Sequence, residues 1–498
     1  MAMLMDLDFT NFGYSATTAT TTTTATTTAS ASTDDGCNWN AWSPVVDWEA
    51  LSSGQEDFHN LVDSMMDESD LLHNLNVRPN TDEECHDLYS PERYATVTDD
   101  ESNSMEDFKG MRLIHLLMAA AEALEGRSKC RELARVILVR LRELVSPKEG
   151  TNMERLAAYF TDALQGLLDG VTTGGVHGKC RSHHHYKAEH HPADVLAAFQ
   201  LLQDVSPYVK FGHFTANQAI LDAVTHDKRV HIVDYDIMEG IQWASLMQAL
   251  VSRKDGPPTP HLRITALSRG GGGRRSFSTV QGTGRRLTAF AASIGQPFSF
   301  HQCRLDPDET FKPSNLKLVR GEALVINCML HLPHFSHRAP NSIASFMAGA
   351  KTLCPRLITL VEEEMGPTED EGFVGRFMDT LHHYSAMYDS LEAGFPTQGR
   401  ARALVERVLL APRISESLDR IYHGRGEDEG CSWGQRLAAD GFCPINISFA
   451  NHCQANLLIG LYNDGYRVEE LGINKLVLGW KTRSLLSVSI WSSKDNDL

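Results

Sequence analysis

Apolar residues recur three or four positions apart in three segments after residue 110, and this spacing predicts three amphipathic helices. The first runs over about 111–124 and the second over about 130–144, while the third follows a capping box at Thr151 and Glu154. Their apolar positions are Leu113, Leu117 and Leu124, then Leu133, Ile137, Leu141 and Leu144, then Leu156, Phe160, Leu164 and Leu167. Together they predict a helical cap over 110–170.

Two roles are open for the apolar positions of this cap. Leucines at helical spacing form the core between packed helices, but short amphipathic helices can also leave an apolar seam that pairs with another chain. The residues expected to pair or to pack are Leu113, Leu117, Leu133, Ile137 and Leu141.

From about residue 192 the pattern changes to strands that alternate with helices, which predicts a mostly parallel sheet. The expected strands are 229–234, 261–267, 297–303, 322–329 and 356–362, with helices between them such as 242–252 and 284–294. Two further strands, 475–480 and 485–491, are separated only by a short break and predict an antiparallel hairpin. The fold class is therefore α/β, with a methyltransferase-like Rossmann core over 192–498.

The N-terminal region differs from the rest in charge and composition. Residues 1–109 contain 22 Asp and Glu but only 3 Lys and Arg, so they carry the acidity of a chain whose net charge is −18. Residues 15–33 are almost entirely Thr, Ala and Ser, which predicts disorder. Trp39, Trp42 and Trp48 then lie among acids, and this pattern fits either a segment that folds on a partner or an arm that docks on its own domain.

A Gly- and His-rich stretch, 171–191, is interpreted as a flexible linker. Its histidines match no defined metal site, so we expect a solvated loop and no bound metal.

The ten cysteines include no C-x-x-C pair, which favours a reducing compartment. The first residues lack the basic start of a secretory signal, and no apolar run has transmembrane length, so we expect no membrane span.

The segment VHIVDYDIMEGIQW, residues 230–243, reads as a buried strand, a turn and a helix, where doubly wound proteins bind nucleotides. Such a turn needs glycines so that backbone N–H groups can approach the ligand. In a D-x-G-x-G-x-G frame from Asp234, the glycine positions hold Asp236, Met238 and Gly240. A carboxylate and a thioether therefore replace two of three glycines, which argues against a bound cofactor.

Other requirements of a methyl-donor enzyme are also poorly met. The second strand ends with Ser268 and Arg269 where an acid should hold the ribose. Asn327 and His331, near the fourth strand, could act as acid and base, but a polar network at the core edge is favoured. Glu362, Glu363 and Glu364 are interpreted as a solvated strand end. We expect no catalytic residue, no cofactor and no small-molecule substrate; the alternative is an enzyme or small-molecule sensor using a pocket beside Asp234.

An arginine- and glycine-rich stretch, 269–286, is interpreted as a loop that could lie along phosphates. Its candidate DNA contacts are Arg269, Arg274, Arg275, Arg285 and Arg286. A mobile surface loop without a ligand is the favoured alternative, because the rest of the chain carries no helix-turn-helix or zinc-finger pattern.

Several segments occur in an order that is typical of one family. VHIVD, formed by Val230, His231, Ile232, Val233 and Asp234, is similar to a VHIID motif. FGHFTANQAILDAV precedes it, GIQWASLMQAL follows it, and RFMDTLHHYSAMYDSLEA and GWKTRSLLSVSIW come later. The last ends in SIW, with isoleucine where the SAW motif has alanine. In this order the segments resemble the plant GRAS family over residues 110–498.

This resemblance implies a nuclear, non-enzymatic transcriptional regulator. GRAS proteins act through complexes with other GRAS proteins, either as hetero-oligomers or as a homodimer, and with DNA-binding factors, so DNA would be reached indirectly. CNWNAWSPVVDWEAL and DFHNLVDSMM narrow the resemblance to a subgroup associated with symbiotic signalling, in Nod-factor and mycorrhizal responses and strigolactone synthesis genes. The block from Glu406, ERVLLAPRISESLDRIYHGRGEDEG, departs from the family's usual sequence there.

Overall fold

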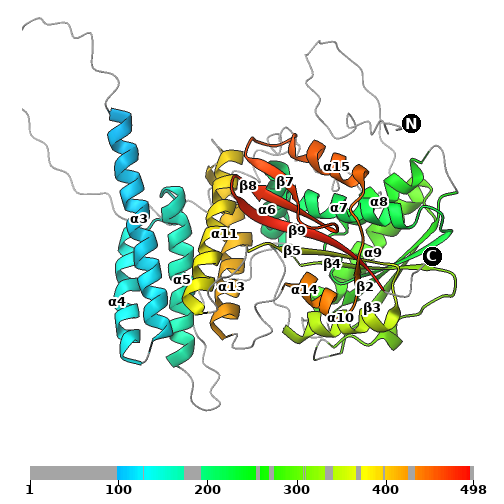
Figure 1. The fold of residues 1–498 in the computed structure, drawn as a ribbon, viewed down its shortest axis with the longest axis horizontal. Coiled ribbons are helices and arrows are strands. Elements are labelled where there is room, and N and C mark those ends of the chain that lie inside the picture. Colours follow the sequence, from blue (N-terminus) through cyan, green and yellow to red (C-terminus); the bar gives the residue numbers. More distant parts are fainter. Residues whose placement is uncertain are drawn as a thin grey trace, which may run out of the picture. The chain divides into compact units, whose positions relative to one another are not determined.

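The computed structural model describes residues 98–126, 128–172, 192–253, 258–268, 274–306, 308, 310–330, 340–365, 372–395, 399–423 and 432–493 (Figure 1). The chain divides into two units, Met1–Met105 and Glu106–Leu498. Apart from the start of the first described helix, all features below belong to the second unit. The predicted N-terminal disorder and the linker histidines lie outside the described residues.

The helices before the sheet are α3 (Thr98–Glu125), α4 (Ser128–Leu144), α5 (Asn152–Thr172), α6 (Pro192–Val205) and α7 (Tyr208–Ala223). Those between strands are α8 (Ile241–Val251), α9 (Arg274–Ile294), the short η3 (Pro313–Asn315) and α10 (Pro340–Leu353). Then follow α11 (Phe373–Gly394), α12 (Gly399–Val405), the π-helical turn η4 (Glu406–Leu410), α13 (Ala411–His423), α14 (Trp433–Ala439) and α15 (Phe449–Ile459). The three predicted cap helices are therefore confirmed, and the Thr151 capping box is formed in both directions.

Within the described part of the chain, nine strands form one mixed sheet with the order β3-β2-β1-β4-β5-β9-β8-β7, and β6 pairs with β9. The strands are β1 (Arg229–Asp234), β2 (His261–Ser268), β3 (Phe298–Arg304), β4 (Ala323–Met329), β5 (Leu357–Glu363), β6 (Cys443–Pro444), β7 (Tyr466–Glu470), β8 (Lys475–Trp480) and β9 (Arg483–Ser492). The first five are parallel, whereas β9 is antiparallel to both β5 and β8. The prediction of a parallel sheet closed by an antiparallel hairpin is thus confirmed.

Helices cover both faces of this sheet. On one face α7 contacts β5 and β9, α8 contacts α7 and α9, and α9 contacts β2 and β3. On the other face lie α10 and α14 (Figure 1). Right-handed crossovers explain this division, because the chain moves from β1 toward β2 in one direction and from β4 toward β5 in the other. The carboxyl ends of β1 and β4 meet where the direction changes, which is the usual ligand position of such sheets.

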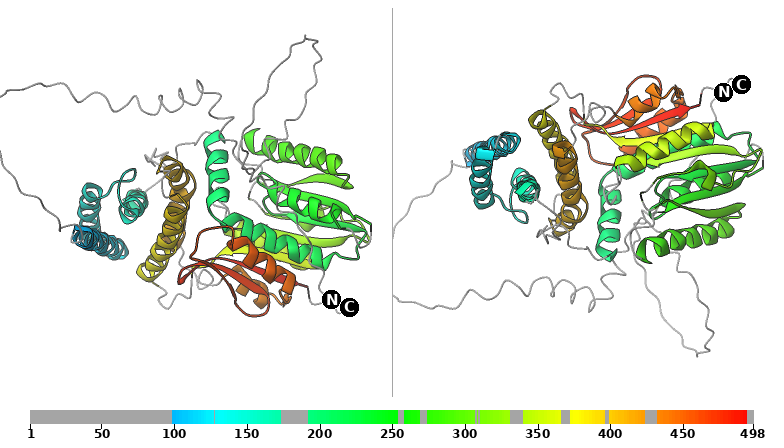
Figure 2. Two further views of the ribbon diagram at one scale, coloured as in Figure 1. Left: turned by 90° about the horizontal axis from the view of Figure 1, so that it is seen from above. Right: turned by 90° about the horizontal axis from the view of Figure 1, so that it is seen from below.

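The helical layer is completed by residues far along the chain. α5 contacts α4, and it also contacts α11 and α13. Figure 2 shows α11 and α13 between the three N-terminal helices and the sheet. Phe160 of α5 lies 5.6 Å from the Phe377 ring and 6.3 Å from the Tyr384 ring, both on α11. The predicted cap over 110–170 is therefore one part of a larger bundle.

The stretch predicted as a loop up to residue 286 is wrong from Arg274 onward, because α9 begins there. One of the glycines that suggested a loop, Gly284, serves packing instead. A Cβ on Gly284 would overlap the Phe300 ring of β3, so the helix can lie on the strand only with glycine at this position. β7 was not predicted, since YRVEE carries exposed charges; such charges are typical of a strand at the edge of a sheet.

Candidate functional site

A closed hydrogen-bond network occupies the ligand position at the carboxyl end of β1. The Asp234 carboxylate is 1% exposed and accepts the Trp243 indole N–H at 2.6 Å. Its other oxygen accepts the backbone N–H of Asp236 at 3.2 Å and the Asn327 amide at 3.3 Å. Asn327 and Gln242 exchange two amide hydrogen bonds of 3.2 Å. The polar groups at this position therefore satisfy one another.

The turn after β1 is shaped by two residues with positive φ. Gly240 has φ of 78° and Met238 has φ of 46°. A Cβ on Gly240 would stand 2.8 Å from Thr283 of α9, and the Thr283 hydroxyl donates to the Met238 carbonyl at 3.0 Å. α9 thus packs directly against the turn, and its Thr283 hydroxyl binds the Met238 carbonyl.

Little space remains beside this turn. The cavity lined by 236–242 together with Phe199, His213 and Met329 has a volume of about 10 Å³. That is about the space of one water molecule, whereas small-molecule sites measure roughly 300–1,000 Å³. Phe199 lies on α6 and His213 on α7, so these two helices close the ligand position at the end of β1, which we call the cradle.

The other residues of the VHIVD motif also lie in the protein interior. Val230, Ile232 and Val233 are buried in the sheet. The His231 Nδ1 lies 2.9 Å from an Arg263 N–H, which can only donate, so Nε2 carries the hydrogen toward Thr265 Oγ1 at 2.8 Å. Burial, with the Arg263 charge, lowers the pKa of His231 to about 3, and this histidine is neutral.

The predicted polar network at the fourth strand is present, since Asn327 also accepts the Thr359 hydroxyl at 2.8 Å. His331 and Arg269 lie outside the described residues. The interpretation of Glu362–Glu364 as a solvated strand end is wrong. Glu362 is 6% exposed and accepts the first backbone N–H groups of α14, from Trp433 at 2.9 Å and from Gly434. A carboxylate at a helix N-terminus satisfies donors that the helix leaves open.

We expect Asp234 to make stability depend on pH. Burial raises its pKa from 3.8 to about 7, so the folded chain keeps a proton that the unfolded chain releases. The unfolding free energy should therefore fall as pH rises from about 4 to about 7, by on the order of 4 kcal/mol from this group. Urea unfolding across this range should give a shallower profile for Asp234→Asn, while Glu406, whose pKa is also raised to about 7, keeps part of the slope. Asp440→Asn, an exposed control, should keep the wild-type slope; equal slopes for Asp234→Asn and wild type would contradict the assignment.

The predicted pairing residues divide by exposure. Leu113, Leu117 and Leu141 are at most 1% exposed, so inside this chain they pack between helices. Leu133 is 56% exposed and Ile137 is half-buried. A contact between these two residues and another protein stays a prediction.

Exposed apolar residues form a stripe on α4. Val136 and Val139 are 66% and 53% exposed and lie on the same side of the helix as Leu133. Only the opposite side of α4, with Ala134, Leu138 and Leu141, is buried. We call Leu133, Val136 and Val139 the α4 stripe.

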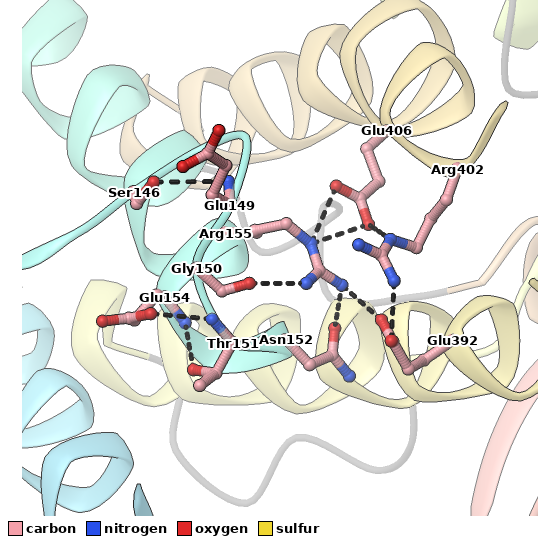
Figure 3. Close-up of polar contacts among 10 residues, drawn as sticks. All are labelled: Ser146, Glu149, Gly150, Thr151, Asn152, Glu154, Arg155, Glu392, Arg402 and Glu406. Carbon is pink, nitrogen blue, oxygen red and sulfur yellow. Dashed lines mark hydrogen bonds and ion pairs between the residues drawn. The ribbon is translucent and has the colours of Figure 1, made fainter. Parts of the chain in front are cut away.

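An ion-pair network with a buried centre joins the cap to the later helices (Figure 3). Arg155 of α5 is 2% exposed, and its Nε lies 3.2 Å from both carboxylate oxygens of Glu406 in η4. Its Nη2 lies 2.5 Å from Glu392 of α11, and its Nη1 donates to the Gly150 carbonyl at 2.7 Å. Arg402 of α12 closes the network by donating to Glu392 at 2.6 Å.

Burial dominates the electrostatics of this network. It raises the pKa of Glu406 to about 7 even though Arg155 and Arg402 favour the charged form. Sequence reasoning missed the network, although there was a signal: Arg155 and Glu406 each interrupt an apolar helical run, in MERLAAYF and LVERVLL. Their partners could not be identified, because the two residues are 251 positions apart.

The arginines predicted to contact DNA are only partly described. Arg274 and Arg275 begin α9, but their side chains are outside the described set. Arg285 is exposed, whereas Arg286 lies 3.2 Å from the Glu239 carboxylate and so interacts within the chain. A DNA contact by these residues stays a prediction.

Two further observations concern metal binding and membrane-spanning helices. Among the residues that the structure describes, no group of three or more His, Cys, Asp and Glu is placed to hold a metal ion. In the same part of the chain, no helix combines the length and apolarity needed to cross a bilayer.

The fold and the site define a class: an α/β protein whose nucleotide position is filled by its own side chains, with an attached helical bundle. The chain belongs to the GRAS domain family, whose model matches residues 113–492. It is 62% identical over 474 residues to Protein NODULATION SIGNALING PATHWAY 2 of Lotus japonicus, covering 93% of this chain and 94% of that protein. It is 58% identical to the protein of the same name from Medicago truncatula, covering 99% and 100%.

A solved structure shares the fold. The crystal structure of SCL7 from Oryza sativa is 30% identical, with a TM-score of 0.61, and the match covers 76% of this chain and 99% of that one. The sequence-based assignment to the GRAS family is thereby confirmed.

Proposed function

We propose that this protein is a non-enzymatic transcriptional regulator that works in nodulation signalling. Its full-length similarity to the two proteins named for that pathway carries the proposal. The filled cradle supports it, because a cavity of about 10 Å³ leaves no space for a methyl-donor nucleotide. Action in the nucleus, mycorrhizal responses and effects on strigolactone-related genes belong to the same proposal.

The protein acts through complexes with other GRAS proteins and with DNA-binding factors, so that it reaches DNA indirectly. The α4 stripe is the surface that we assign to pairing with another GRAS protein. Three large apolar side chains more than half exposed on one helix favour contact with a partner over contact with water. Ion pairs Arg135–Glu132 and Arg140–Glu143 flank the stripe and can form the polar rim of an interface.

Replacing Val136 and Val139 together by aspartate should weaken binding to a GRAS partner by about tenfold or more. Both side chains are exposed, so the melting temperature should stay close to wild type. Binding of the purified full chain to a panel of GRAS proteins by biolayer interferometry measures the effect. Leu318→Asp, at a 51% exposed apolar residue outside α4, is the matched control. Unchanged binding in the α4 variant would contradict the pairing surface.

Calorimetry separates this function from the alternative of an enzyme or small-molecule sensor. We expect no heat of binding when S-adenosylmethionine is titrated into the full chain. Saturable binding that is lost in Asp234→Ala would show that the cradle opens for a ligand, and it would overturn the non-enzymatic proposal. A fluorescent fusion expressed in root cells tests nuclear action: exclusion from the nucleus would contradict it.

A further inference from the structure

A second exposed apolar surface lies on α15, in the α/β part of the fold. Phe449, Cys453 and Leu457 follow one another at every fourth position of α15, and on a helix this spacing places side chains along one side. Leu461 lies in the turn that follows the helix, which ends at Ile459. Phe449 is 82% exposed, Leu457 is 66% exposed and Leu461 is 68% exposed. We call these four residues the α15 stripe.

The opposite side of α15 is already used for packing. Asn451, Ala455 and Leu458 are buried, and the Asn451 amide donates to the Thr215 carbonyl of α7 at 3.0 Å. A helix with apolar residues on both sides is typical of a buried helix, yet this one is covered on only one side. α15 therefore has the composition of a helix with a second partner.

The loop between β7 and β8 extends the stripe. Leu471 and Ile473 are each 55% exposed. The Ile473 carbonyl accepts the backbone N–H of Ile447 at 2.9 Å, which fixes this loop beside the start of α15. The extended surface thus combines five large exposed apolar side chains from two neighbouring segments.

The charges around this surface select the kind of partner. Residues 449–473 contain three carboxylates, Asp464, Glu469 and Glu470, but only one arginine and no lysine. That arginine, Arg467, pairs with Glu469. The Glu470 carboxylate is 49% exposed and lies 3.4 Å from the His452 ring. Lys210 of α7 lies over the Tyr462 ring, but Asp204 offsets its charge. Carboxylates therefore outnumber cations beside the apolar stripe. Two copies of this face would repel each other, whereas a basic partner is attracted.

We propose that the α15 stripe, with Leu471 and Ile473, binds an amphipathic helix of another protein that carries lysine or arginine beside its apolar face. Helix-in-groove and helix-on-helix recognition use such apolar anchors at helical spacing. α15 contacts α7 and β7, whereas α4 contacts α5, so the two stripes belong to different elements. One chain can then hold a GRAS partner at α4 and a basic helical partner at α15.

A synthetic peptide provides the test. A fluorescein-labelled helical peptide with leucine at every third or fourth position and lysine elsewhere is titrated with the full-length protein, and its anisotropy is measured. We expect saturable binding, and the double variant Phe449→Glu with Leu457→Glu should weaken it by about tenfold or more. Leu133→Glu on α4 is the matched control and should bind the peptide like wild type. A peptide with glutamate in place of lysine should bind much more weakly.

Several results would overturn the proposal. Equal affinity of the wild type and the Phe449/Leu457 variant would show that the peptide binds elsewhere, and equal affinity for the glutamate peptide would remove the charge argument. Light scattering that shows a dimer of the wild type, lost only in the Phe449/Leu457 variant, would assign the face to a second copy of this chain instead. The far-UV circular dichroism and melting temperature of the variant should match the wild type. The α4 binding experiment can fail without affecting these outcomes, because it uses other residues.

Discussion

Replacing Arg155 by methionine is expected to lower the free energy of unfolding by about 3–5 kcal/mol, because the buried Glu406 carboxylate loses the closer of its two arginines and keeps Arg402, whose Nε lies 3.5 Å away. Glu406 is fully buried, and the Arg155 guanidinium touches both of its oxygens. The same change removes the donor to the Gly150 carbonyl and one of the two cations beside Glu392. Urea unfolding followed by circular dichroism measures the loss.

Two further variants separate a broken buried pair from a general loss of charge. Arg142→Met removes a half-exposed arginine from the same bundle, 3.6 Å from Asp162, and should change stability by no more than about 0.5 kcal/mol. The double variant Arg155→Met with Glu406→Met should regain part of the lost stability, because both buried charges are removed while Arg402 and Glu392 stay paired. If Arg142→Met cost as much as Arg155→Met, the buried network would have no special importance.

Leu117→Ala and Leu141→Ala should each destabilise the bundle by about 2–5 kcal/mol, since both side chains are fully buried and each change leaves a cavity. Leu133→Ala should stay within about 0.5 kcal/mol of wild type, because this residue is 56% exposed. Thermal unfolding of the three variants provides the comparison. Leucines of the same sequence pattern thus have two expected roles, packing inside the bundle and contact with a partner, and the exposure of each side chain separates them.

Binding measurements complete this comparison. Leu133→Ala should weaken association with a GRAS partner at an unchanged melting temperature, whereas Leu117→Ala should act on binding only through unfolding. A stable Leu117→Ala variant with lost association would show instead that the buried leucine becomes accessible in the complex.

Much of the fold could be predicted because its signals are local. Strand β1 and the hairpin of β8 and β9 are short segments rich in branched apolar residues and tryptophan, and the capping box at Thr151 marks the start of α5. The start of α9 could not be predicted, since the need for glycine at Gly284 comes from Phe300 on a different element. The role of Glu362 was missed for the same reason, because the helix that it caps begins at Trp433.

The candidate site was only partly predictable. The replacement of two glycines by Asp236 and Met238 could be read from the sequence, because a nucleotide-binding turn is made of residues next to one another in the chain. The division of the cap leucines into buried and exposed sets depends on α11 and α13, which the sequence does not place beside α5. Exposed apolar residues on α15 gave no signal either, since LLIGL reads as ordinary core.

The separation of Arg155 and Glu406 has a consequence for synthesis on the ribosome. Arg155 of α5 emerges long before its partner Glu406, which is 251 residues behind. At roughly 5–20 residues per second, translation leaves the apolar side of α5 uncovered for roughly 10–50 s. During that interval the nascent bundle is a natural client for a chaperone, and slow translation should increase its loss to aggregation.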